Sequence, residues 1–381
     1  MAMPDPIPAP EARPDVERLR GYSAPLEGRR GLLRLDFNEN TIGPSPAVTE
    51  AIRSYPADQV AVYPEYDGLR EALIANLQAS PAGLAHPLVI DQVGLFNGVD
   101  AAIHAVIHAY GAAGDTLLTT SPTFGYYAPC AGMQGMAIEA LPHELPGFRF
   151  PLEAMRSALQ RRPKILMLCN PNNPTGTRIP AEQVLELATA APGTLVVVDE
   201  LYEAFTGDSV LPHVDFTVHA NLLVLRSLAK TAGLAGLRMG FAIGSAEVID
   251  RISRVTGPYD VNSLAVTAAF AALGDQVYTD HYVAEVVRAR DYLVTQLTQF
   301  GAVFHCDGGN YLLVWPRRSA EEVEQQLRSA GILVRSMAGK PQIDGALRVS
   351  IGTLEQMQRF WAIYAQLEGC LLYTSDAADE V

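Results

Sequence analysis

Short apolar runs that alternate with helical patterns are the feature that most constrains how this chain can fold. Four of these runs begin at residues 116, 164, 194 and 221 and read TLLTT, KILMLCN, TLVVVDE and NLLVLRSL. Segments with apolar residues at helical spacing, such as PAEQVLELATAA, lie between them. Strands that are apolar on both faces are typical of parallel sheets covered by helices on both sides. The pattern therefore predicts an α/β fold.

The two ends of the chain depart from this pattern. The first twenty residues are rich in proline and charge, which predicts a loose arm and excludes a signal peptide. Beyond about residue 260, long helical stretches alternate with the strand-like runs NYLLVW and LRVSIG, which indicates a smaller α+β domain. The last segment, 370–381, does not continue the preceding helical pattern, and we interpret it as a non-native or disordered tail.

Composition excludes several classes of partner. The 381 residues include 28 Lys and Arg against 42 Asp and Glu, a net charge of -14, so a nucleic-acid-binding surface is not expected. The four cysteines have no metal-ligand spacing, which predicts no metal site and reduced thiols in a cytoplasmic protein. The longest apolar run, LAVTAAFAAL, is too short to cross a membrane.

Polar residues follow the predicted strands. In parallel sheets the ligand binds beyond the carboxyl ends of the strands. KILMLCN continues into PNNPTGT with Asn173, TLVVVDE contains Asp199 with Tyr202 shortly after, and NLLVLRSL contains Ser227 and is followed by Lys230. Each of these residues alone has an ordinary explanation as a turn, a cap or a solvated lysine. Together they supply the groups that would hold an anionic aromatic aldehyde, which predicts pyridoxal 5'-phosphate as cofactor.

Each group has a chemical role in that prediction. Lys230 would form the Schiff base with the aldehyde, a covalent aldimine, and later carry the substrate proton. Asp199 would stabilise the protonated ring nitrogen of the cofactor. Asn173 and Tyr202 would orient the ring's 3-oxygen. Phe124, in SPTFGYY, would stack on the ring face. We therefore expect Lys230, Asp199 and Tyr202 to be the catalytic residues.

The cofactor phosphate needs positive groups and backbone donors. A helix predicted to open at NGVD offers them at its first turn, because a helix N-terminus favours negative charge. Ser227 and Arg238 would complete this phosphate cup with a hydroxyl and a guanidinium. The residues expected at the start of the helix are Gly98, Val99 and Asp100.

These motifs together resemble the class I and II aminotransferases of fold type I, which use pyridoxal phosphate, and most closely their histidinol-phosphate subgroup. The similarity runs from about residue 15 to 369 and rests on LDFNEN, YPEYDGLREAL, NGVD, SPTFGYY, NPNNPTG, VVVDELY, SLAKTAGLAGLRMG and LRVSIGT. It implies a large cofactor domain of residues 46–262 with a mostly parallel seven-stranded sheet between helices. It also implies a small domain formed by residues 1–45 and 263–369.

The resemblance further implies a homodimer with shared active sites. Tyr63 would reach the cofactor phosphate of the neighbouring subunit, and Arg348 would bind the carboxylate or phosphate of the substrate. Tyr22 and Asn38 would line the substrate end, beside Asn173. Three positions depart from the common family pattern: Ala229 replaces a serine before the lysine, Ile42 replaces an aromatic residue, and Phe124 stands where tyrosine is frequent.

The expected activity is a transamination between histidinol phosphate, or a related amino donor, and 2-oxoglutarate. Aromatic amino acids remain alternative donors, because Arg348 can hold a carboxylate as well as a phosphate. A decarboxylase or cyclase on the same scaffold would use the same lysine. A non-catalytic regulator is the least favoured alternative, because the residues before Gly43 are too few to form a DNA-binding domain.

Overall fold

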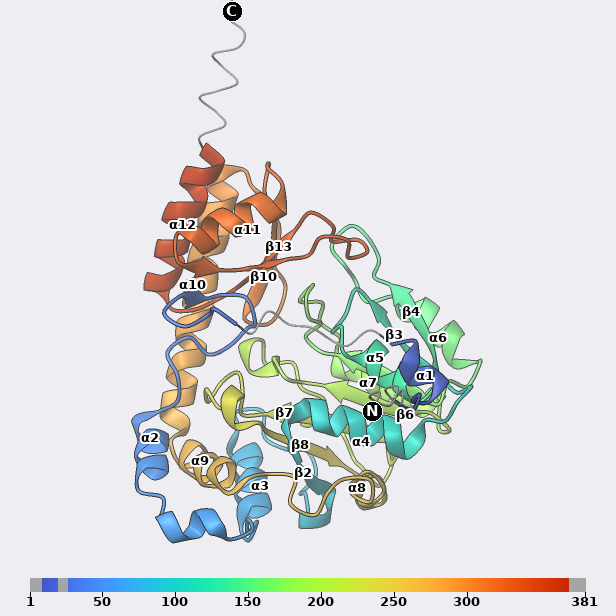
Figure 1. Cartoon of the computed structure of the whole chain (residues 1–381). Coiled ribbons are helices and arrows are strands. Elements are labelled where there is room, and N and C mark those ends of the chain that lie inside the picture. The colour runs from blue at the N-terminus through green and yellow to red at the C-terminus, as the bar shows by residue number, and fades with distance from the viewer. Residues whose placement is uncertain (1–8, 20–26, 370–381) are drawn as a thin grey trace, which may run out of the picture.

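The computed structural model of the chain describes residues 9–19 and 27–369. Figure 1 shows a large domain around one sheet and a smaller domain, with α10, α11 and α12, beside it. Tyr22 and the segment 370–381, for which the sequence made predictions, lie outside the described residues.

The large domain is built on a seven-stranded sheet, as predicted. Six strands run parallel, and β8 alone runs antiparallel to both of its neighbours, β2 and β7. In spatial order the strands are β2 (Val93–Asn97), β8 (Met239–Gly244), β7 (Leu222–Ser227), β6 (Leu195–Asp199), β5 (Ile165–Cys169), β3 (Thr116–Ser121) and β4 (Ala137–Pro142).

Helices cover both faces of this sheet, which explains why its central strands are apolar throughout. Successive side chains of a strand point to opposite faces, so that Leu166 and Val196 pack into one core while Ile165 and Val197 pack into the other. The first face is covered by α3 (Leu69–Ala79), α6 (Leu152–Leu159), α7 (Ala181–Ala190) and α9 (Ser263–Gly274). The second is covered by α4 (Gly98–Tyr110), α5 (Tyr127–Met133) and α8 (Ala246–Ser253).

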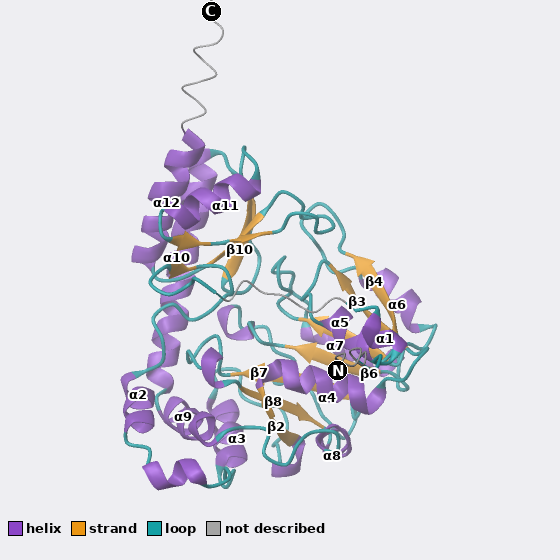
Figure 2. Cartoon of the chain, viewed as in Figure 1, coloured by secondary structure: helices purple, strands orange, loops and turns teal. Residues whose placement is uncertain are grey.

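The small domain has its own core and a four-stranded antiparallel sheet. The strand order is β12 (Arg335–Ser336), β13 (Leu347–Ser350), β10 (Tyr311–Trp315) and β9 (Val303–His305). The sheet packs with α10 (Gln276–Phe300), α11 (Ala320–Ser329) and α12 (Leu354–Gly369). The N-terminal arm joins this domain because β1 (Leu33–Arg34) pairs with β11 (Ile332–Leu333). Segments from both halves of the chain therefore contribute to it, and Figure 2 shows α10, α11 and α12 beside its strands.

The helix start predicted at NGVD is confirmed, since α4 begins at Gly98. Helix α2 (Pro46–Arg53) has Ser45 as its N-cap, whose side chain accepts a hydrogen bond from the Val48 N–H, with proline at the first helical position. Short helices α1 (Pro14–Glu17), η1 (Ala57–Ala61), η2 (Ile90–Gln92), η3 (Glu203–Phe205) and η4 (Ala235–Leu237) complete the described elements.

The domain boundary at 262/263 stays a prediction. Helix α9, which that boundary assigns to the small domain, contributes Ala265, Val266 and Ala269 to a core of the large sheet. Within residues 9–19 and 27–369, no helix combines the length and the apolar character that a membrane span requires.

Candidate active site

The residues predicted to bind a cofactor meet at the carboxyl edge of the large sheet. Asp199 ends β6, Ser227 ends β7, and Lys230 follows in the loop after β7. Arg238 directly precedes β8, and because that strand runs antiparallel to β7, its first residues lie at the same edge. We call Asp199, Ser227, Lys230 and Arg238 the floor of the site.

Lys230 is enclosed although part of its side chain remains accessible. Its Nζ donates a hydrogen bond to the carbonyl oxygen of Phe37 at 2.9 Å and lies 5.9 Å from the centre of the Tyr202 ring. Burial, reinforced by the positive charge of Arg348, lowers the pKa of Lys230 from 10.5 to about 8. More of this amine is therefore neutral near pH 7 than in an exposed lysine, and a neutral amine is what nucleophilic attack and proton abstraction require.

Asp199 is a buried carboxylate with two protein donors. The Tyr127 hydroxyl donates to its Oδ2 at 2.7 Å, and the Leu201 N–H donates to its Oδ1 at 3.3 Å. Burial raises the pKa of Asp199 from 3.8 to about 6, and the two hydrogen bonds oppose that rise. A nearby cation would stabilise this charge further, so the site suits a protonated ring nitrogen.

A network of side chains from both domains forms the second side of the site. The Tyr202 hydroxyl accepts hydrogen bonds from the amide nitrogens of Asn38 and Asn173, each at 3.2 Å. Arg348 donates to Oδ1 of Asn173 at 2.7 Å, and Ser350 Oγ donates to Oδ1 of Asn38 at 2.8 Å. We call Asn38, Asn173, Tyr202 and Arg348 the wall of the site. All four side chains are buried.

The first turn of α4 forms part of a cup for an anion. Gly98 has a φ of +80°, a backbone conformation that favours glycine, and without a β-carbon it lets the Arg238 guanidinium approach closely. Arg238 pairs with Asp100 at 2.6 Å, and Val99 is buried beside them. The N–H groups at a helix start lack partners within the helix and, with a guanidinium alongside, favour a phosphate.

Ser227 holds the loop that leads to Lys230. Its Oγ donates to the carbonyl oxygen of Met239 at 2.8 Å and accepts a hydrogen bond from the Ala229 N–H at 3.0 Å. Ala229 is buried and adds no hydroxyl of its own. The hydroxyl of Ser227 therefore fixes the loop between two strands of the sheet.

Two residues that the sequence analysis singled out are exposed in the single chain. Tyr63 has 71% of its surface exposed and stacks on Tyr259, with ring centres 4.2 Å apart. Ile42, one of the departures from the family pattern, is also exposed. Phe124, by contrast, meets Tyr127 edge to face at 5.4 Å and so lies close to Asp199.

The structure adds four groups that sequence reasoning missed. Tyr127 binds Asp199, the Phe37 carbonyl binds Lys230, and Ser350 binds Asn38. Arg335 on β12 lies directly opposite Arg348 on the neighbouring antiparallel strand β13, so both side chains project from the same face of the sheet. Only Tyr127 left a signal in the sequence, since it stands three residues after Phe124 and begins a helix.

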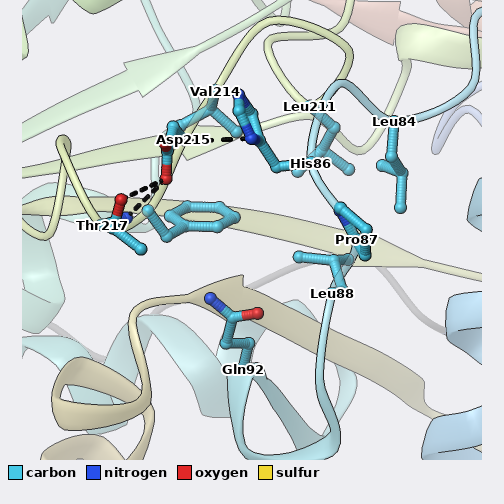
Figure 3. A pocket seen from close by; sticks show the side chains of 10 residues that line it. Leu84, His86, Pro87, Leu88, Gln92, Leu211, Val214, Asp215 and Thr217 are labelled. Atoms are coloured by element: carbon cyan, nitrogen blue, oxygen red, sulfur yellow. Dashed lines mark hydrogen bonds and ion pairs between the residues drawn. The ribbon is translucent and has the colours of Figure 1, made fainter.

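A pocket elsewhere on the molecule is lined by none of these residues. Figure 3 shows this pocket of about 240 Å³, where Asp215 accepts hydrogen bonds from Thr217 and lies 3.9 Å from His86. It lies between the segments that precede β2 and β7, so it is separate from the strand ends that carry the floor. The described residues hold no cluster of three or more side chains suited to a metal ion.

Comparison with known proteins identifies the family of the chain. The family described as aminotransferase class I and II matches residues 30–362. The histidinol-phosphate aminotransferase of Moorella thermoacetica is 32% identical over 92% of this chain and 91% of its own, and that of Symbiobacterium thermophilum is 34% identical over 91% and 96%. The solved structure of the Sinorhizobium meliloti histidinol-phosphate aminotransferase in complex with pyridoxal-5'-phosphate has the same fold, with a TM-score of 0.80 at 24% identity over 93% of this chain and 97% of the other.

Proposed function

Because the chain belongs to the class I and II aminotransferases, we propose that it transfers the amino group of histidinol phosphate, or of a closely related phosphorylated amine, to 2-oxoglutarate. Pyridoxal 5'-phosphate would be the cofactor. Two curated relatives that span most of the chain carry the histidinol-phosphate name, which supports this choice of donor.

Two neighbouring arginines of the small-domain sheet are the observation that supports a phosphorylated amino donor. Arg348 contacts Asn173 in the wall, and the guanidinium of its strand partner Arg335 lies 5.8 Å from the ring of Phe37. Arg348 lies close enough to help lower the pKa of Lys230, and Arg335 is next to Phe37, whose carbonyl oxygen binds Lys230. A phosphate monoester carries about two negative charges. Two guanidiniums match it better than they match one carboxylate.

The residues present fit pyridoxal phosphate. The Asp199 carboxylate is buried and forms no salt bridge within the described part of the chain, so a protonated ring nitrogen would supply the missing positive partner. Glycines keep the phosphate cup open, because a β-carbon at Gly240 would lie 2.5 Å from the backbone of Gly98. Asn173 and Tyr202 would bind the ring oxygen, and Phe124 would cover the ring face.

Lys230 would perform the proton transfer. When bound, pyridoxal phosphate supplies an electron sink for the bonding electrons left at the donor's Cα. Lys230, whose pKa is lowered to about 8, would attach the cofactor covalently, then take the proton from Cα and return it as the amino group is transferred. Arg348 would hold the anionic end of the donor so that its Cα lies next to Nζ.

We also propose that the enzyme is a homodimer with shared active sites. Tyr63 and Tyr259 form an exposed stacked pair, with 71% and 52% of their surfaces accessible, and Val60 and Val62 beside Tyr63 are exposed as well. Exposed aromatic and aliphatic residues in one place are typical of a protein interface. Tyr63 would then reach the partner's phosphate cup. The cytoplasmic location expected from the sequence stays a prediction.

Absorbance spectroscopy tests the proposal. The purified chain with pyridoxal phosphate should show a band that changes on addition of histidinol phosphate and hardly changes with phenylalanine. The reverse result would identify an aromatic aminotransferase. A band that answers to neither donor would direct attention to decarboxylase or cyclase activity.

Chemical mapping then tests the role of Lys230. The sequence contains three lysines, of which Lys164 and Lys340 are exposed. Borohydride reduction of the complex followed by peptide mass spectrometry should place the cofactor on Lys230. Label on Lys164 or Lys340 instead would contradict the assignment.

A further inference from the structure

Tyr127 contacts two of the groups expected to hold the cofactor ring. It is the first residue of α5 and has only 1% of its surface exposed. Its hydroxyl donates to Oδ2 of Asp199 at 2.7 Å, and its ring meets Phe124 at 5.4 Å with an interplanar angle of 81°. One side chain therefore touches both the expected partner of the ring nitrogen and the expected cover of the ring face.

The Asp199 carboxylate depends strongly on its few donors. It has 2% of its surface exposed, so water does not compensate its charge. Its hydrogen-bond donors are the Tyr127 hydroxyl and the Leu201 N–H, of which Tyr127 provides the shorter bond. A donor to a carboxylate favours the charged form, whereas burial favours the neutral form.

Other ionisable groups around Asp199 cannot replace the Tyr127 hydroxyl. The Cys169 thiol has its pKa raised by burial and stays neutral. Asp100 adds a like charge, and Lys230 is a cation that the proposed reaction occupies with the cofactor. The ionisable side chains that interact electrostatically with Asp199 lie on the elements packed around it. They are Cys169 on β5, Asp100 on α4, Lys230 after β7, Tyr202 after β6, Tyr311 on β10 and Tyr127 on α5.

We propose that Tyr127 is a positioning residue that orients the Asp199 carboxylate and stabilises its charge, and thereby sets how tightly the protein holds the cofactor ring. This inference rests on the proposed function for the identity of the cofactor. Tyr127 acts through Asp199 and is not itself expected to touch the substrate. Because its phenyl ring packs on Phe124 independently of the hydroxyl, the two contributions of Tyr127 can be separated by removing a single oxygen atom.

Cofactor binding by Tyr127→Phe tests the inference. The dissociation constant of pyridoxal phosphate is measured by titration of the cofactor-stripped full chain between about pH 5 and 9. In the wild type, affinity should fall as the pH drops through the Asp199 pKa of about 6, because binding must then release the Asp199 proton. In Tyr127→Phe the dissociation constant should rise about tenfold, and the midpoint of this fall should move up by about one pH unit.

Two further variants exclude a purely structural effect. Tyr364→Phe removes a buried phenol in the small-domain core, so it should lower the melting temperature without moving the pH midpoint. In an Asp199→Asn background, Tyr127→Phe should have no further effect on the dissociation constant, because the charge on which Tyr127 acts is absent.

The possible results distinguish a positioning role of Tyr127 from a packing role. A shifted midpoint that disappears in the Asp199→Asn background supports the positioning role. An unchanged midpoint together with a lowered melting temperature, as in Tyr364→Phe, would overturn it and leave Tyr127 as a packing residue. If the wild-type chain does not bind pyridoxal phosphate at any pH, the proposed function fails and this inference fails with it.

Discussion

The floor and the wall of the site hold their polar groups in different ways. The floor residues lie at the ends of adjacent strands or in the loop between two of them, and the backbone ladder of one sheet fixes where these strands and this loop meet. The wall residues bind one another instead, and the bond between Arg348 and Asn173 joins residues 175 apart in the chain. The floor is therefore built by one domain alone, whereas the wall exists only where two domains meet.

This difference also separates two kinds of electrostatic environment. In the floor, burial shifts the pKa of Lys230 downward and that of Asp199 upward, so each group is pushed toward its neutral form. In the wall, the Arg348 guanidinium is matched by an amide oxygen and a backbone carbonyl oxygen. Substitution of Lys230 in the floor should therefore change the chemical step, and substitution of Arg348 in the wall should change substrate binding.

The sharpest test of this distinction is Lys230→Ala, which removes the reactive amine of the floor. We expect turnover to fall by about 10⁴-fold or more, because one residue supplies both the covalent attachment and the proton transfer. Single-turnover kinetics with histidinol phosphate would measure the loss. Lys164→Ala, which removes an exposed lysine, is the control and should leave turnover unchanged. Turnover of Lys230→Ala near the wild-type rate would show that the floor is assigned wrongly.

The corresponding wall substitution is Arg348→Gln. We expect the KM for histidinol phosphate to rise about 100-fold, since the variant loses the charge for the donor's anionic end and leaves Asn173 Oδ1 without its donor. Steady-state kinetics would measure the change, and Arg254→Gln on the exposed face of a helix end serves as the control. A fall in kcat with unchanged KM would contradict the division between floor and wall.

A smaller effect is expected at Arg335, beside the wall. Arg335→Gln should raise the KM for the phosphorylated donor about tenfold and hardly alter that for 2-oxoglutarate, because a dianion gains more from the second guanidinium. The variant should also weaken the dependence of KM on ionic strength between about 0.02 and 0.2 M. Equal effects on both substrates would remove the argument for a phosphorylated donor.

The smallest effect concerns the stability of the cofactor-free floor. The Lys230 pKa is depressed from 10.5 to about 8, so charged Lys230 destabilises the fold at pH 7, and this cost disappears as the pH rises from about 8 to 10.5. Cofactor-free Lys230→Ala should therefore melt about 2 to 6 °C above the wild type at pH 7. Thermal denaturation at pH 7 and pH 10 would show whether the difference shrinks. A constant difference would mean that the titration of Lys230 is not its cause.

The floor residues could be predicted from local patterns, whereas Asn38 and Arg348 of the wall were expected only through the family resemblance, and the hydrogen bonds within the wall were not predicted. Asp199, Ser227 and Lys230 follow apolar runs directly, so local pattern and the geometry of parallel sheets suffice to bring them together. The seven-stranded sheet and the start of α4 at Gly98 follow from the same local signals and the family resemblance.

The missed groups depend on information that no local pattern contains. The pairing of Arg335 with Arg348 requires the register of two short strands, and register is set by packing between distant segments. The Phe37 group that binds Lys230 is a backbone carbonyl, which any residue type could supply. Asn38 was expected at the substrate end through the resemblance, yet its bond with Ser350 spans 312 residues.

The reversed direction of β8 has a consequence for protein engineering. Because β7 and β8 are antiparallel neighbours, the loop between them leaves the sheet and returns to it at a single edge. Lys230 and Arg238 thus lie in one continuous segment, residues 228–238, and the two ends of this segment remain adjacent whatever its length. This segment could therefore be exchanged between related proteins as a unit. Such an exchange would transfer the reactive amine and the neighbouring positive charge together.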